Sequence, residues 1–289
     1  MTVVESILDV RTELGEGPVW HGGYLYWLNI TGGHLYRFDP ATGRNESTQY
    51  LQMIGAVAPR RGGGFVAAME KGFALIEFGN ETIRMLAEPE SHLPGNRFND
   101  GKCDPQGRFW AGTMEREPAT PAGTMYMLDA DRKVHKRFGG IRISNGLCWS
   151  LDGRTFYHND TLTHQIAAYD FDPETGNLGE RRVAVQIPER DGYPDGMTID
   201  TDGNLWVAMW AGSAVICFDP KAGKEIRRIA MPVSQPSSVT FGGRDLGDLY
   251  ITSARQDIPA EQLAKEPRAG NLFRCRPGVQ GVPVNEYAG

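Results

Sequence analysis

The chain has 289 residues, a mass of 31.9 kDa and a net charge of −6, and it contains 36 glycines and 18 prolines. No run of lysine and arginine exceeds two residues, and no stretch approaches the roughly 20 apolar residues of a membrane span. We therefore expect neither a nucleic-acid partner nor a membrane-spanning segment, and nothing in the sequence indicates an obligate protein partner.

The N-terminus lacks a basic segment followed by an apolar one, so a secreted protein is not expected and a cytoplasmic location is predicted. The four cysteines stand singly, without the paired spacing of a thiolate metal site. Free buried thiols are the expectation. A disulfide between Cys103 and Cys148 stays open, because the two occupy equivalent places in neighbouring repeats.

One hairpin pattern recurs along the chain: a polar residue before glycine, a short apolar strand, a turn, and an aromatic strand. Clear copies occupy residues 16–27, 100–111, 144–160 and 195–208, and weaker copies occupy residues 55–68 and 237–252. The Asp-Gly turns supply the positive φ that a tight hairpin needs. Six copies at intervals of about 40–50 residues match the period of four-stranded propeller blades.

A second repeat marks the turn between the third and fourth strands of a blade. It reads FDPATG, FDPETG and FDPKAG at residues 38–43, 171–176 and 218–223. Proline presets φ for a type I turn, and glycine takes the left-handed position after it. The predicted fold is therefore all-β: a single six-bladed propeller over residues 1–289, with four antiparallel strands in each blade.

The predicted blades follow the chain in order. They cover residues 15–51, 52–86, 99–138, 141–187, 192–231 and 232–289. A closed ring leaves no sheet edge unpaired, so residues 3–10 are predicted to form the outer strand of the last blade. Two long loops are expected at residues 87–98 and 114–123, and a short helix at residues 257–267.

The residue before the repeat glycine is the candidate functional position, because the first strand of every propeller blade lines the central channel. This position holds Glu16, Asp100, Asn145 and Asp195 in the four clear copies. Buried carboxylates so close together repel unless a cation neutralises them. An all-oxygen set favours one hard divalent ion, Ca²⁺, Mg²⁺ or Mn²⁺, with Zn²⁺ or Fe²⁺ also open. Taken singly, the Asn and Asp residues are ordinary turn formers and Glu16 is a solvated loop residue; their shared repeat position favours a site.

The sequence resembles the regucalcin/gluconolactonase (senescence marker protein) family over nearly its whole length. The matching motifs are LGEGPVW (14–20), NRFNDGK (96–102), AGTM (111–114), ISNGL (143–147), PDGM (194–197) and the terminal YAG (287–289). The resemblance implies a six-bladed propeller with one divalent metal in the channel, and many members hydrolyse sugar lactones. It also implies that Glu16, Asn145 and Asp195 bind the metal.

By the same resemblance, Arg97 and Asn99 contact the substrate, as does Glu117 in the loop at residues 114–123, with Glu115 as the alternative. A metal can polarise a lactone carbonyl and make a water nucleophilic. Asp195 is predicted to accept a proton from that water as general base; the alternative is that it only binds the metal. Arginine suits ring and hydroxyl oxygens through its rigid fork of donors.

Weaker candidates lie at the ends of the second strands: Asn29, Glu70, Asp160, Trp210 and Arg255. The predicted function is a metal-dependent hydrolase that opens aldonolactones to aldonic acids. A non-catalytic Ca²⁺-binding regulator and a phosphotriester or aryl-ester hydrolase on the same metal site are the alternatives. The sequence leaves open the sugar, its ring size, the native metal and the oligomeric state.

Overall fold

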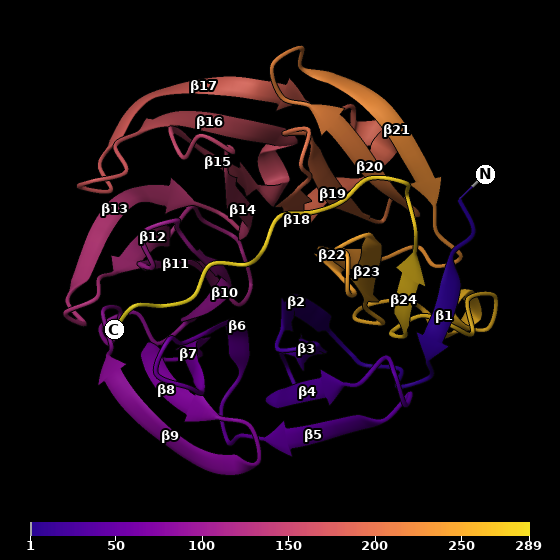
Figure 1. The fold of residues 1–289 in the computed structure, drawn as a ribbon, viewed down its shortest axis with the longest axis horizontal. Helices are drawn as coiled ribbons and strands as arrows, with labels where there is room; N and C mark the ends of the chain where they lie inside the picture. Colours follow the sequence, from indigo (N-terminus) through magenta and orange to yellow (C-terminus); the bar gives the residue numbers. More distant parts are fainter. Residues whose placement is uncertain (1) are drawn as a thin grey trace.

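The computed structural model describes residues 2–289 and forms a ring of six four-stranded antiparallel sheets (Figure 1). The predicted six-bladed propeller is therefore confirmed. The first three blades comprise β2 (Gly15–His21), β3 (Tyr24–Asn29), β4 (His34–Phe38) and β5 (Asn45–Gln49); β6 (Ile54–Pro59), β7 (Phe65–Met69), β8 (Phe73–Glu77) and β9 (Asn80–Ala87); and β10 (Asn96–Cys103), β11 (Phe109–Glu115), β12 (Gly123–Leu128) and β13 (Val134–Ile141).

The remaining blades have the same plan, and the last one takes its outer strand from the N-terminus. They comprise β14 (Ser144–Trp149), β15 (Thr155–Asp160), β16 (Gln165–Phe171) and β17 (Leu178–Gln186); β18 (Tyr193–Ile199), β19 (Leu205–Trp210), β20 (Ala214–Asp219) and β21 (Lys224–Ala230); and β22 (Pro236–Gly242), β23 (Asp248–Ser253), β24 (Leu272–Cys275) and β1 (Glu5–Leu8). The antiparallel pairing of β1 with β24 closes the ring, as predicted.

Two sequence expectations were wrong in detail. The loop predicted over residues 87–98 ends earlier, because β10 already begins at Asn96 and pairs with β11. Arg97 therefore lies on a strand rather than on a loop. The helix predicted over residues 257–267 is only one turn long, α1 (Ala260–Leu263).

The core lies between neighbouring sheets, where aromatic side chains from the second strands fill the space. Trp27, Trp110 and Trp206 are almost completely buried in this way. Trp110 packs with Trp149 and Phe156 of the next blade. The repeated aromatic residue of the hairpin pattern is therefore the contact that holds adjacent blades together.

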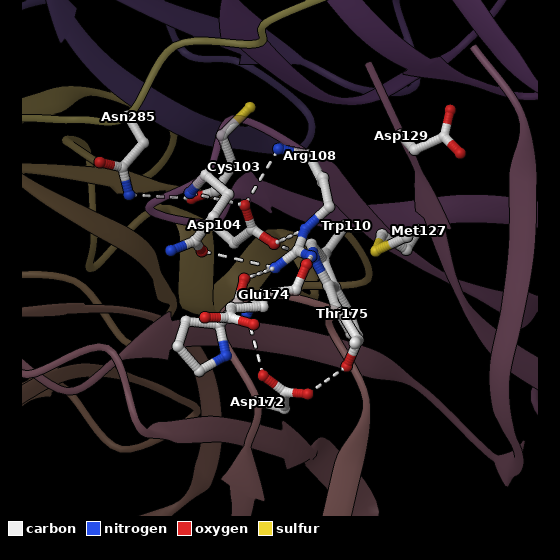
Figure 2. Close-up of polar contacts among 12 residues, drawn as sticks. Cys103, Asp104, Arg108, Trp110, Met127, Asp129, Asp172, Glu174, Thr175 and Asn285 are labelled. Atoms are coloured by element: carbon white, nitrogen blue, oxygen red, sulfur yellow. Dashed lines mark hydrogen bonds and ion pairs between the residues drawn. The ribbon is translucent and has the colours of Figure 1, made fainter. Parts of the chain in front are cut away.

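A buried acidic residue anchors the first hairpin of blade three (Figure 2). The fully buried carboxylate of Asp104 accepts hydrogen bonds from Arg108 Nε (2.5 Å) and Trp110 Nε1 (2.9 Å). The Arg108 guanidinium also donates to the carbonyls of Pro173 and Glu174 in the next blade. The ion pair thus fixes one turn and joins two blades.

The C-terminal segment crosses the ring (Figure 1). It lies on the face that carries the turns between the first and second strands, where Ala288 N donates to the Gly107 carbonyl and Thr201 N donates to the Gln280 carbonyl. It bridges Gly281 to Asp200 of blade five and Tyr287 to Arg60 of blade two. The Tyr287 hydroxyl then donates to the Asp129 carbonyl at 2.6 Å. A cavity of about 390 Å³ remains between this segment and the inner strands.

Replacing Asp104 with alanine is expected to lower the free energy of unfolding by about 3–5 kcal/mol, because the Arg108 guanidinium would stay buried without its counter-charge. Urea unfolding measures the change. The matched control is Asp152→Ala, since the exposed Asp152 carboxylate also serves a hairpin turn, and its loss should cost about 1 kcal/mol or less. Equal losses for the two variants would contradict this account.

Candidate functional site

Four polar side chains share one position on four inner strands. Glu16, Asp100, Asn145 and Asp195 lie on β2, β10, β14 and β18, the strands that surround the centre of the ring (Figure 1). All four side chains are buried. They lie at the end of each inner strand away from the first hairpin turn. The site therefore lies toward the face opposite the C-terminal segment.

At this position each inner strand has an irregular register with its second strand. The register shifts between Glu16 and Val19 in β2, between Ser144 and Leu147 in β14, and between Pro194 and Met197 in β18. The other three inner strands shift at the equivalent place. A β-bulge bends a strand and redirects a side chain, so the repeated irregularity aims these polar groups into the channel.

The repeat glycines allow the inner strands to approach each other closely. A Cβ on Gly146 would lie 2.5 Å from the Asp195 carbonyl oxygen, and one on Gly196 would collide with the Ser238 side chain. Both glycines lie within strands, so their role is close packing and not a turn. Any larger residue would force neighbouring blades apart at the site.

The buried carboxylates raise each other's proton affinity. Burial, and secondly the Asp100 carboxylate, raise the pKa of Glu16 to about 8. Burial, followed by the charges of Glu16 and Asp100, raises the pKa of Asp195 well above its ordinary value. Burial lowers the pKa of Arg97 to about 10, against the opposing effect of Glu16. One guanidinium thus offsets only part of the negative charge, which leaves the site suited to a further cation.

Asn145 offers the third oxygen of the candidate metal set. Its Nδ2 donates to Thr161 Oγ1 at 3.0 Å, and its amide lies against the Asp195 carboxylate. Its Oδ1 is buried and has no hydrogen-bond partner within residues 2–289. Such an orphaned acceptor costs about 1–3 kcal/mol unless another group meets it. A divalent ion beside Glu16 and Asp195 would supply that partner.

The Glu16 and Asp195 carboxylates form a three-ligand metal set only together with the Asn145 amide oxygen. Within the described part of the chain, no group of three or more His, Cys, Asp or Glu side chains is arranged to hold a metal ion. Asp100 is therefore treated as a neighbour of the candidate set rather than as a third carboxylate ligand. Burial raises the pKa of Asp100, and the Lys102 ammonium opposes only part of that rise.

Arg97 and Asn99 present hydrogen-bond donors beside these groups. Arg97 Nη1 donates to Asn99 Oδ1 at 2.6 Å and to the Phe98 carbonyl at 2.9 Å, while Asn99 Nδ2 donates to the Ser144 carbonyl at 2.8 Å. Arg97 Nη2 and Nε make no hydrogen bond within residues 2–289. The guanidinium is thus held at one nitrogen and free to bind ligand oxygens at the others.

The structure separates the two acidic residues of the 114–123 loop. Glu115 is already engaged, because its Oε2 accepts a hydrogen bond from Thr120 N at 2.8 Å. Glu117 is exposed and makes no side-chain hydrogen bond with the described residues. The structure therefore does not bring Glu117 into the cluster around Asp195. It leaves Glu117 available for a ligand, whereas Glu115 shapes the loop.

The weaker candidates mostly serve the framework. Asp160 accepts hydrogen bonds from the backbone N–H groups of Arg142 and Ile143, and Glu70 pairs with Arg116. All four cysteines are free. Sequence reasoning missed Thr161, which contacts Asn145 directly; only its place immediately after Asp160 at a second-strand end pointed toward it.

Comparison with known proteins shows which family this chain resembles. Residues 14–255 match the family model described as SMP-30/Gluconolactonase/LRE-like region. Regucalcin of Danio rerio is 41% identical over 291 residues, covering 99% of this chain and 98% of the relative. Regucalcin of Homo sapiens is 36% identical over 294 residues, with the same shares covered.

Solved structures agree with this match. A regucalcin from Agrobacterium tumefaciens, described as a calcium-binding protein, superposes with a TM-score of 0.94 at 32% identity and covers 99% of this chain and 97% of its own. A luciferin-regenerating enzyme gives a TM-score of 0.93 at 30% identity, with 99% of each chain covered. A Xanthomonas campestris gluconolactonase, at 20% identity and a TM-score of 0.77, shares the fold. None of the helices described is long and apolar enough to cross a membrane. The chain belongs to the SMP-30/gluconolactonase/LRE-like family.

Proposed function

We propose that the protein is a divalent-metal-dependent hydrolase that opens sugar lactones to aldonic acids. The observation that carries this proposal is the convergence of Glu16, Asp195 and the orphaned Asn145 oxygen next to the Arg97 guanidinium. A cation site beside free hydrogen-bond donors suits a neutral, polyhydroxylated substrate with one reactive carbonyl. The family model that matches residues 14–255 is named in part for gluconolactonase, which supports the same substrate class.

In this proposal Glu16, Asn145 and Asp195 hold the metal. When bound, the ion would polarise the lactone carbonyl and lower the pKa of a coordinated water. Three oxygen donors, two of them charged, fit a hard divalent cation that keeps part of its hydration shell. The description of the Agrobacterium tumefaciens relative makes Ca²⁺ the first ion to test.

The other steps, substrate binding and proton transfer, are assigned to individual side chains. Arg97 binds substrate oxygens through Nη2 and Nε, while its Nη1 contact with Asn99 fixes the orientation of the guanidinium. Asp195 accepts the proton of the attacking water through a carboxylate oxygen. Glu117, which is exposed in the loop at residues 114–123, binds a sugar hydroxyl, and this loop excludes part of the bulk water. Because the site is built from buried groups, charge developing on the carbonyl oxygen is poorly screened by solvent.

Lactone hydrolysis tests this proposal. Chelator-stripped protein should not accelerate the opening of glucono-, galactono-, xylono- or arabinonolactone above the spontaneous rate, and restoring Ca²⁺, Mg²⁺, Mn²⁺, Zn²⁺ or Fe²⁺ singly should return turnover. Asp195→Asn should lower kcat by about 10²–10⁴-fold because it removes the proton acceptor. Acid release followed with a pH indicator measures the rate.

Matched variants separate the roles. Asp202→Asn, in an exposed hairpin turn on the opposite face, should keep wild-type turnover. Glu117→Gln should raise KM about tenfold with unchanged metal affinity, in line with the loss of a charged hydrogen bond. Tight metal binding without turnover on any lactone would favour the non-catalytic regulator instead. Turnover confined to aryl esters or phosphotriesters would favour the other hydrolase alternative.

Metal binding should also depend on pH in a defined direction. In metal-free protein the pKa of Glu16 is raised to about 8 from an ordinary 4.5, chiefly by burial. Between these values the folded protein holds a proton that the unfolded chain releases, so this contribution to stability falls as pH rises. The metal replaces that proton. The increase in Tm on adding metal should therefore grow from pH 5 to pH 8 and level off above.

Thermal unfolding with and without the metal, at half-unit steps from pH 5 to pH 8.5, checks this expectation. The difference at each pH cancels the titration of groups remote from the ion. A gain in Tm that is constant across this range, or that shrinks as pH rises, would be incompatible with buried carboxylates as the metal ligands.

A further inference from the structure

The end of β15 touches the two strands that carry Asn145 and Asp195. Asn159 Nδ2 donates to the Asp195 carbonyl at 2.8 Å. The Asp160 carboxylate accepts from the two backbone N–H groups that precede β14. Thr161, the buried first residue of the 3₁₀ turn η1 (Thr161–Thr163), completes the set. Three consecutive residues thus connect the backbone of blade four to that of blade five beside the candidate ligands.

The Thr161 hydroxyl makes two hydrogen bonds and is the donor in one and the acceptor in the other. Its Oγ1 donates to the Pro194 carbonyl at 3.0 Å and accepts from Asn145 Nδ2 at 3.0 Å. A hydroxyl has one proton, and a carbonyl can only accept. The proton of Thr161 is therefore committed to Pro194, and only a donor can occupy the side facing Asn145.

This pattern of donor and acceptor decides how the Asn145 amide is oriented. The amide nitrogen is held at Thr161, so the oxygen must point elsewhere, and it lies buried without a hydrogen-bond partner. An amide turned by 180° would set Oδ1 against the Thr161 lone pairs and would aim N–H groups, which cannot bind a cation, at the candidate metal position. The hydroxyl excludes that arrangement.

We infer that Thr161 is a positioning residue that selects the metal-binding face of Asn145. Pro194 immediately precedes Asp195, so the same hydroxyl joins the strands of two candidate ligands and fixes the orientation of one. The inference rests on the proposed metal site. It goes beyond that site in assigning an outer hydrogen bond that sets metal affinity, as the groups behind metal-binding side chains commonly do.

The test replaces Thr161 with valine, which keeps the shape of the side chain and removes the hydroxyl. Isothermal titration with Ca²⁺ and with Mn²⁺ should show metal affinity weakened about 10–100-fold. Thr161→Ser keeps the hydroxyl and should bind within about threefold of wild type. In an Asn145→Ala background Thr161→Val should cause no further loss, because the amide to be oriented is absent.

Two further measurements separate positioning from general stabilisation. Thr163→Val alters the same turn at an exposed hydroxyl that donates to the Asp160 carbonyl, and it should bind metal as wild type does. The Mn²⁺ electron paramagnetic resonance spectrum of Thr161→Val should change in shape, reporting a lost protein ligand, while that of Thr161→Ser should match wild type. If Thr161→Val does not fold, Thr161→Ala replaces it in the test, because alanine also lacks the hydroxyl and its smaller side chain cannot clash with the surrounding atoms.

Either of two results would overturn the inference: wild-type affinity in Thr161→Val or Thr161→Ala, or equal weakening in Thr161→Ser. The wild-type titration separates this failure from that of the proposed function. If the wild-type protein binds no metal, both the proposed metal site and the role of Thr161 are wrong. If wild type binds metal and Thr161→Val binds it equally well, only the role of Thr161 is wrong.

Discussion

The structure depends at its centre on bringing buried carboxylates together. Ring closure places Glu16 and Asp195 on inner strands around one channel, and Gly146 of β14 lets that strand approach the backbone of β18 at Asp195. Burial, and after it the repulsion between the carboxylates, raises the pKa of both groups, and Arg97 offsets only part of this rise. The fold therefore concentrates carboxyl groups in a site where a divalent cation would stabilise their ionised forms. The blade contacts, built from indole rings and the Asp104–Arg108 pair, hold the ring against this repulsion.

Much of the fold could be predicted because one unit repeats six times. The hairpin period, the aromatic second strand and the FDPxxG turns each carry a local signal, and together they predict the blade number and the closing role of the N-terminal strand. The same repeat gave equivalent positions to Glu16, Asn145 and Asp195. The β10 boundary was predicted wrongly because Arg97 and Asn99 replace the apolar alternation of a strand with polar groups that face the channel.

The remaining features of the fold and the site could not be predicted, because no local sequence pattern indicates them. Thr161 donates to a backbone carbonyl 33 residues away, and a carbonyl acceptor leaves no trace in a side-chain pattern. The C-terminal crossing segment is also fixed by backbone bridges, here to Asp200 and Arg60. Choosing between Glu115 and Glu117 required the loop conformation, because a contact with Thr120 N is what engages one of them. These features depend on neighbours that only the closed ring brings together.

The most direct measurement is anomalous diffraction from crystals soaked in Mn²⁺, which scatters strongly enough to be located without ambiguity. The account predicts one channel peak bonded to a Glu16 carboxylate oxygen, Asn145 Oδ1 and an Asp195 carboxylate oxygen, with water in the remaining positions. A channel without a peak, or a peak bonded to Asp100 while Asn145 Oδ1 stays unliganded, would contradict the account.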